Sequence, residues 1–337
     1  MMAAYRVEAA ACIRCGSSAT VAPALFRIEA ASAEMRRQPA SQPEEALAAA
    51  ARTLCPTAAI SGPPSGAPLP LPDDGARLCD ALAVTAERAR WRWDDLPWER
   101  PRQATPGLPA LVREIAFSEL ATFAASRRFL HEFGDDVDFS GWIAVWLYEE
   151  ARHPRSLIAW LDGALPDFSD GEIERGRLTA PFPKTRLLTL ATNVLSEQVA
   201  TARYLAMSRG TADPLLSAIA RHIAADEARH GASFFLYARR ALAALPVDDG
   251  RRQVLTMLRF WLDDGGQVVH PVQLLGERAA GRTEVQAAAA ALPIPRPALE
   301  RRLIAIVGHL LALPLADRAD VAATLRTLAT RREAMGA

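Results

Sequence analysis

Two short stretches, EEARH at residues 149–153 and DEARH at residues 226–230, decide how this sequence is expected to fold. Each places a histidine three residues after a glutamate, Glu150 with His153 and Glu227 with His230, and each puts another acid directly before that glutamate. Residues three apart share one face of an α-helix, so each stretch presents a carboxylate and an imidazole side by side.

The helix faces that carry these pairs are apolar. Neighbouring positions on the expected faces hold Ile219, Ile223 and Phe234 around the second pair, and Val145, Trp146 and Leu157 around the first. Burying a carboxylate beside an imidazole is costly unless the two are paired or bound to a metal. Two such pairs on two helices therefore indicate a metal centre rather than packing.

Helical bundles that hold two iron or manganese ions combine two E-x-x-H helices with one glutamate from each of two further helices. The sequence offers Glu119 in REIAFSELATF and Glu197 in LATNVLSEQVATARYL, both on apolar faces. Glu114 competes with Glu119, and we prefer Glu119. The expected metal ligands are Glu119, Glu150, His153, Glu197, Glu227 and His230. Asp226, Arg152 and Arg229 flank these ligands and are expected to orient them.

Residues 110–245 resemble the ferritin-like di-iron oxidoreductases, and most closely the soluble acyl-carrier-protein desaturases. IAADEARH, at residues 223–230, is typical of the second motif of that family. The resemblance implies a ferritin-like helical bundle in which the six ligands bind two irons that activate O2, and we assign Glu150 and Glu227 as the catalytic pair. A site occupied by manganese, or by one ion of each metal, is the other option.

The sequence departs from the desaturase pattern at two positions. The family's threonine three residues after the third glutamate is replaced by Ala200, with Thr201 next to it. Pro154 directly follows His153, and a proline there should kink the helix because it cannot donate to the carbonyl of Glu150. Arylamine oxygenases and natural-product di-iron oxidases are similar, so the reaction stays open among desaturation, hydroxylation and N-oxygenation.

A second set of candidate ligands lies near the N-terminus. CIRCGSSATVAPALFRIEA, with CPTAAI forty residues after Cys15, resembles the single-cluster bacterial ferredoxins, whose pattern is C-x2-C-x2-C with a remote C-P. The resemblance implies an iron–sulfur cluster, [3Fe–4S] or [4Fe–4S], bound by Cys12, Cys15 and Cys55, with Ser18 at the third ligand position. Ser18 as a weak ligand, Cys79 as a replacement, and a retained fold without a cluster are the alternatives.

The sequence divides into three parts. Residues 1–60 are expected to form an α+β ferredoxin-like domain with strand-like runs YRVEA and LFRIEA and a helix at PEEALAAAARTL. Residues 61–75 are rich in Pro and Gly and indicate a flexible linker. Residues 76–337 are expected to be a mainly α ferritin-like bundle, with long helices at 109–133, 139–163, 184–209, 214–244, 250–265, 283–292 and 297–334. The aromatic run RWRWDDLPW, residues 90–98, is expected to pack across helices.

The composition of the sequence limits the classes of partner and the cellular environment that are expected. The 337 residues carry a net charge of zero, which gives no basic field for nucleic acid. The sequence contains no run of 18 apolar residues, so no membrane-spanning helix is expected. Four cysteines, three of them in one patterned segment, read as ligands and favour a reducing cytoplasm. A homodimer is expected from the resemblance to the bundle family.

These observations predict an O2-dependent non-haem di-iron oxygenase or desaturase with a fused electron-transfer module. Its substrate would be carrier-protein-bound, or a small amine or amino acid of a biosynthetic pathway, and a reductase is a possible further partner. The alternative is a non-catalytic ferritin-like protein that handles iron or senses redox state.

Overall fold

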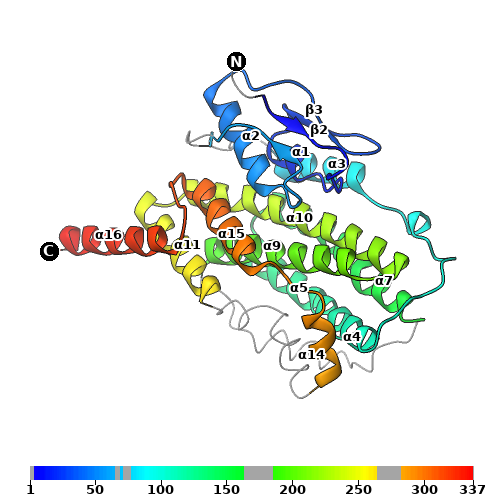
Figure 1. Cartoon of the computed structure of the whole chain (residues 1–337). Helices are drawn as coiled ribbons and strands as arrows, with labels where there is room; N and C mark the ends of the chain where they lie inside the picture. Colours follow the sequence, from blue (N-terminus) through cyan, green and yellow to red (C-terminus); the bar gives the residue numbers. More distant parts are fainter. Residues whose placement is uncertain (1–3, 65–68, 71–76, 163–184, 264–281, 337) are drawn as a thin grey trace.

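The computed structural model describes residues 4–64, 69–70, 77–162, 185–263 and 282–336, and Figure 1 shows the arrangement of their elements. A small unit of short strands and two helices at the N-terminus lies on a large assembly of helices. The predicted fold class, mainly α with a small α+β part at the N-terminus, is therefore confirmed. The predicted linker at 61–75 lies largely outside the described residues.

The N-terminal unit is built from two antiparallel strand pairs and two helices. Its elements are β1 (Arg6–Val7), α1 (Ser17–Val21), β2 (Phe26–Ile28), β3 (Ala33–Met35), α2 (Gln42–Leu54) and β4 (Ile60–Ser61), with β1 paired to β4 and β2 to β3. Helix α2 begins where the Ser41 side chain accepts the N–H of Glu44. Its alanine face packs on Tyr5, Leu25 and Phe26, which gives the unit a small core.

The remaining elements are helices. They are α3 (Leu78–Ala89), a 3-10 turn (Trp93–Asp95), α4 (Leu108–Leu120), α5 (Thr122–Glu132), α6 (Val137–Glu150), α7 (Arg152–Trp160), α9 (Arg186–Gly210), α10 (Pro214–Ala243), α11 (Val247–Leu262), α14 (Thr283–Ala290), α15 (Arg296–Leu311) and α16 (Arg318–Gly336). Helices α9 and α10 are the long central pair. Asp213 caps α10 and Pro214 occupies its first turn, so that side-chain capping fixes where the helix that carries Glu227 and His230 starts.

Three of the predicted helices are each divided in two, which corrects the prediction. The 109–133 segment breaks at Ala121, whose N–H bonds back to the Ser118 carbonyl in a tightened turn. The 139–163 segment breaks at Ala151, as Pro154 predicts, and the 297–334 segment ends its first half at Ala312, which takes φ 51° two residues before Pro314. Local backbone chemistry, rather than the apolar pattern, sets these boundaries.

The N-terminal unit is docked on the helices rather than held apart as a flexible arm. Arg221 of α10 donates to the carbonyl oxygen of Cys12 at 3.0 Å, and Arg302 of α15 donates to the carbonyl oxygen of Leu54 at 2.7 Å. In the opposite direction, Arg14 of the N-terminal unit donates to the carbonyl oxygen of Ala89 at the end of α3. Contacts with three helices fix the position of the cysteine loop.

Candidate metal centre

The six predicted ligands meet in the interior of the bundle. Glu119 lies in the last turn of α4, Glu150 ends α6, His153 begins α7, Glu197 lies in α9, and Glu227 and His230 lie in α10. Their ligating atoms form two groups, each within 4.8 Å: Glu119, Glu150, His153 and Glu227 in the first, and Glu150, Glu197, Glu227 and His230 in the second. The two groups share Glu150 and Glu227, so the arrangement offers two adjacent ion sites with two common carboxylates.

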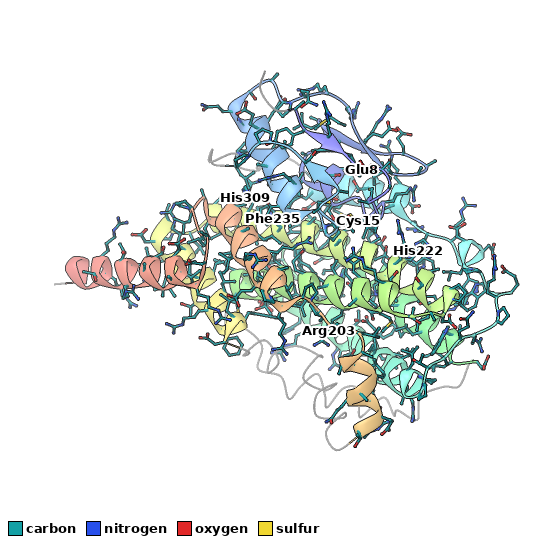
Figure 2. All side chains as sticks on the ribbon, in the orientation of Figure 1. Glu8, Cys15, Arg203, His222, Phe235 and His309 are labelled. Atoms are coloured by element: carbon teal, nitrogen blue, oxygen red, sulfur yellow. The ribbon has the colours of Figure 1, made fainter. Side chains whose placement is uncertain are left out.

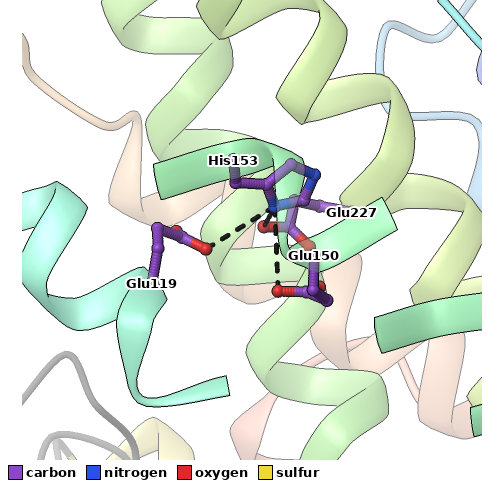
Figure 3. Close-up of side chains that lie close together, drawn as sticks. All are labelled: Glu119, Glu150, His153 and Glu227. Atoms are coloured by element: carbon purple, nitrogen blue, oxygen red, sulfur yellow. Dashed lines mark ion pairs between the residues drawn. The ribbon is translucent and has the colours of Figure 1, made fainter. Parts of the chain in front are cut away.

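Both imidazoles turn the same nitrogen towards the carboxylates. Nδ1 of His153 lies 3.5 Å from Glu119, 3.7 Å from Glu150 and 3.6 Å from Glu227, as Figure 3 illustrates. Nδ1 of His230 lies 2.9 Å from Glu150 and 3.3 Å from Glu227. His153 Nδ1 is buried and has no hydrogen-bond partner. A buried nitrogen without a partner, facing three carboxylates, fits a metal ligand, because a cation would occupy the space between them.

The other ring nitrogen of each histidine, Nε2, faces a second set of charged groups. Nε2 of His153 lies 3.3 Å from Asp226, and Nε2 of His230 lies 3.0 Å from Glu149. Both of these carboxylates accept from one Nη2 of Arg229, each at 2.6 Å. A carboxylate on Nε2 fixes the ring and leaves Nδ1 free to bind a metal. One guanidinium therefore orients both histidines.

Burial and mutual charge shift the ionisation of the ligands in opposite directions. Burial, together with the charge of Glu150, raises the pKa of Glu197 to about 8 and the pKa of Glu227 well above its usual range. Burial acts against ionisation of Glu150 too, but His153 and His230 outweigh it and lower its pKa. The histidine pKa values are raised well above the usual range because the surrounding carboxylates outweigh burial. Without a metal, the site therefore holds protons at neutral pH.

Glu114, the alternative to Glu119, lies away from the carboxylate–histidine cluster. Glu114 is fully buried, but Arg282 donates to its Oε1 at 2.5 Å. Glu119 instead receives the hydroxyl hydrogen bond of Tyr204 and faces His153. The structure thus brings Glu119, and not Glu114, to the carboxylate–histidine cluster.

Several polar side chains at the site were not assigned from the sequence. The Trp91 indole N–H donates to Asp226 at 2.9 Å, and Arg152 lies 3.9 Å over the Trp91 ring. Thr122 donates to Glu150 at 3.1 Å, and Thr201 donates to the carbonyl oxygen of Glu197 at 2.6 Å. The aromatic run does pack across helices, but Trp91 also reaches the carboxylate behind His153. Only its indole N–H, a donor that seeks a partner when buried, pointed to such a role.

The predicted cluster cysteines lie close together in the N-terminal unit. The Cys12 sulfur accepts the backbone N–H groups of Arg14 at 3.3 Å and Ala33 at 3.4 Å. Burial, and then the neighbouring Cys55, raise the pKa of the Cys15 thiol to about 11, so these thiols lie within electrostatic reach of one another. Backbone donors aimed at sulfur and three neighbouring thiols, two of them buried, fit an iron–sulfur cluster, whose irons bind the deprotonated form.

The chain around Cys15 explains why the loop has this shape. Gly16 takes φ 87°, and a Cβ there would lie 3.0 Å from Ile28 Cδ1, so glycine suits both the turn and the space. Ser18 is buried in the first turn of α1. Cys79 lies at the start of α3 and packs against Gly141 of α6. Gly16 contacts the other end of α3. The structure therefore does not bring Cys79 to the other three cysteines.

One arginine connects the two sites. Arg229 Nη1 donates to the carbonyl oxygen of Cys15 at 3.0 Å, while its Nη2 holds the carboxylates behind both histidines. The Ser17 hydroxyl lies 2.8 Å from the carbonyl oxygen of Ala228 on the same helix. Figure 2 shows Cys15 at the edge of the N-terminal unit that faces α10. The loop of cluster cysteines is thus hydrogen-bonded to the helix that carries Glu227 and His230.

Comparison with known proteins identifies the N-terminal unit. Residues 7–62 match the family model for the 4Fe-4S single cluster domain of ferredoxin I. This match, together with the cysteine geometry, supports an iron–sulfur cluster and a role in electron transfer. No curated protein and no solved structure matches the chain. Among the helices of the described residues, none has the length and apolar character needed to cross a membrane.

Proposed function

We propose that this protein is an O2-dependent non-haem di-iron oxidoreductase that draws electrons from its own N-terminal cluster. The observation that carries the proposal is the pair of ligand groups that share Glu150 and Glu227. Four carboxylates offset most of the charge of two divalent ions, and the two neutral imidazoles complete a set that leaves positions for a further ligand. When bound, a pair of irons in such a site supplies the reductive activation of O2 that oxidation of an organic substrate requires.

The residues of the chain position the metals and exclude water. His153 and His230 offer Nδ1 to one ion each, and Arg229 fixes both rings through Asp226 and Glu149. We assign Glu150 and Glu227 as the catalytic pair because each belongs to both groups and would therefore contact both metal ions. Five of the six ligands are buried, and His153, Glu227 and His230 are 2% exposed or less, so water has little access around the ligands.

Two side chains are suited to hold protons at the site. Glu197 has a pKa of about 8 because burial and the nearby Glu150 disfavour its charge. Tyr204 donates to Glu119 and keeps its proton, because burial and then Glu119 raise the pKa of the phenol well above its usual range. A metal bound to Glu197 would displace its proton, so we assign the Tyr204 hydroxyl as the proton reservoir of the reaction.

The N-terminal unit supports the electron-transfer part of the proposal. Cys12, Cys15 and Cys55 would hold the cluster, with Ser18 at the remaining corner, and the cluster would supply single electrons. The docking of Cys15 onto Arg229 favours delivery within one chain. A reductase is the further partner we propose, and the substrate is either an acyl chain on a carrier protein or a small amine or amino acid. We also propose that the protein acts as a homodimer.

Metal counting and O2 uptake test the proposal. Because cluster iron is accompanied by acid-labile sulfide, iron in excess of the cluster reports the di-iron centre. We expect two excess irons per chain, and rapid O2 uptake after reduction. Slow accumulation of iron into a mineral core would instead favour the ferritin-like protein that stores or senses iron.

Two variants test the ligand set. Glu227→Ala should remove both excess irons, because Glu227 belongs to both groups, while labile sulfide stays at the wild-type level. Glu132→Gln is the control, since this half-buried glutamate of α5 accepts from Thr189 and is not a ligand. Two excess irons retained in Glu227→Ala would refute the ligand set.

A further inference from the structure

Three arginines of the helices donate to the backbone of the N-terminal unit beside the three predicted cluster cysteines. Each donates to a carbonyl oxygen, and the pairs are Arg221 with Cys12 at 3.0 Å, Arg229 with Cys15 at 3.0 Å, and Arg302 with Leu54, which precedes Cys55, at 2.7 Å. Two of these arginines lie in α10 and the third lies in α15. The helices therefore place a guanidinium beside each of the three cysteines.

Two of these three positive charges are balanced or screened. Arg229 donates to the carboxylates of Glu149 and Asp226, each at 2.6 Å, so two negative charges offset its own. Arg221 is exposed, so water and salt screen its charge. Neither of these two arginines therefore places much unbalanced charge beside the cysteines.

Arg302 differs because no acid balances its charge. Among the residues that the structure describes, no carboxylate pairs with Arg302, and its Nε is buried without a partner. Burial lowers the pKa of Arg302 to about 10, while the Cys55 and Cys15 thiols act in the opposite direction, so the guanidinium stays charged at neutral pH. A buried cation without a carboxylate is costly, so its position favours another anion close by.

The position of Arg302 makes a cluster bound to Cys55 that anion. Arg302 lies beside both chain neighbours of Cys55, because it donates to the carbonyl oxygen of Leu54 and lines the same cavity as Pro56. A cysteine that binds iron does so as a negatively charged thiolate, and reduction adds one more electron to the cluster. A positive charge nearby therefore stabilises the reduced cluster more than the oxidised one.

We propose that the positive charge of Arg302 raises the midpoint potential of the iron–sulfur cluster. Helix α15 thereby makes the docked cluster easier to reduce than the same cluster without the helices. The step concerned is the gain of one electron by the cluster from the reductase, with no bond formed or broken. This effect rests on the cluster of the proposed function but needs neither ion of the metal centre, so the two can fail separately.

Redox titration of the full-length protein, followed by the EPR signal of the cluster, tests the role of Arg302. Arg302→Gln keeps a donor for the Leu54 carbonyl but removes the charge. We expect its ratio of reduced to oxidised cluster at a fixed ambient potential to fall at least tenfold, which is about 59 mV for a one-electron couple. Arg302→Lys keeps the charge and should stay close to the wild type. An unchanged potential in Arg302→Gln, or equal falls in both variants, would overturn the proposal.

Two control variants and a sulfide assay complete the test. Arg301→Gln removes a charge from the exposed neighbour of Arg302 and should leave the potential unchanged. Arg221→Gln removes a screened charge and should lower the potential less than Arg302→Gln, and an equal fall would assign the effect to docking instead. A wild type without acid-labile sulfide would overturn the cluster and the role of Arg302 together. Wild-type sulfide with an unchanged potential in Arg302→Gln would overturn the role of Arg302 alone.

The wild type alone supplies a second readout, because coupling between two events is reciprocal. Since the docked helices favour the reduced cluster, reduction must strengthen the docking of the N-terminal unit. Helix α1 reports docking, because its residues are all buried and the Ser17 hydroxyl donates to the Ala228 carbonyl of α10 at 2.8 Å. Its amides should exchange with solvent at least tenfold more slowly in the reduced protein than in the oxidised protein. Equal exchange in the two states would overturn the proposal.

Discussion

His153 shows most directly what single residues contribute to the metal centre. Its ring is completely buried, with Nε2 towards Asp226 and Nδ1 towards three glutamates that it does not hydrogen-bond. A proton on Nδ1 would offset part of the negative charge, but it could not bond all three carboxylates at distances of 3.5 to 3.7 Å. A metal ion can, because it binds several ligands at once. The metal-free centre should therefore behave as a store of protons.

Metal binding is expected to release protons. At neutral pH the raised pKa values keep Glu197 and Glu227 protonated and both histidines charged, so a metal must displace these protons. The affinity for Fe(II) should rise at least tenfold per pH unit between about pH 6 and pH 8, the factor that each released proton contributes. Anaerobic calorimetry in two buffers of different ionisation enthalpy measures the number released.

The stability of the metal-free protein should depend on pH in the matching direction. A group whose pKa is raised in the folded state stabilises the fold below its unfolded pKa and loses that contribution as pH rises through the folded value. Glu197 and the two histidines all shift this way, so the thermal midpoint without metal should fall from pH 6 to pH 9. The metal-loaded protein should not show this fall, and equal slopes for the two forms would contradict the argument.

We expect the type of cluster to depend on Ser18. A serine hydroxyl is a weaker ligand for iron than a thiolate, so the iron at this corner should leave first. We expect mild oxidation of the wild type to give the EPR signal of a three-iron cluster, and Ser18→Cys to suppress it. Cys79→Ser serves as the control, because Cys79 packs on Gly141 and should leave the signal unchanged. The same signal in Ser18→Cys would show that Ser18 does not face the cluster.

At the scale of single residues, the sequence indicated the candidate ligands because a charged side chain on an apolar helix face is costly to bury unless it is paired or bound to a metal. It could not separate Glu114 from Glu119 by that argument, since both lie among apolar neighbours. What separates them is Arg282, which pairs with Glu114 from a position 168 residues further along the chain. The contact between Trp91 and Asp226 likewise joins residues 135 positions apart, so the local sequence could not predict it.

At the scale of elements, the centre depends on helices that stop where a regular pattern would continue. Glu150 is the last residue of α6, and Ala151 leads directly into α7, where His153 lies. The apolar period runs through this point, so it predicted one helix, whereas Pro154 predicted the break. The break sets how the carboxylate of Glu150 and the ring of His153 face each other.

Pro154→Ala tests whether that break matters for the metal. An alanine restores an N–H that can donate to the carbonyl of Glu150, so α6 and α7 should become more continuous and turn His153 away from Glu150. We expect metal affinity to fall about tenfold, as it does when the support of a ligand is changed. Pro214→Ala is the control, because a proline in the first turn of α10 replaces no helical hydrogen bond. Equal metal affinities in the two variants would show that the break between α6 and α7 does not affect metal binding.

At the scale of the whole molecule, the docking of the N-terminal unit is the feature that the sequence left open. A Pro- and Gly-rich segment indicated a flexible tether, and nothing local in the chain showed where the unit would lie. Several of the contacts that place it join residues more than 200 positions apart, such as Arg229 with Cys15 and Arg221 with Cys12. Docked in this way, the cluster cysteines and the metal ligands belong to one body.

Docking predicts that electrons reach the metal centre within one chain. After rapid reduction of the cluster, the rate of metal-centre reduction should be first order and unchanged over a hundredfold range of protein concentration. Arg221→Lys and Arg229→Lys each weaken one contact with a cysteine carbonyl, but only Arg229 also holds the carboxylates behind both histidines. A lysine lacks the forked donors that reach all three oxygens, so Arg229→Lys should slow the step at least tenfold more than Arg221→Lys. A rate that rises with protein concentration would mean transfer between chains, and equal effects of the two substitutions would leave Arg229 as a docking residue alone.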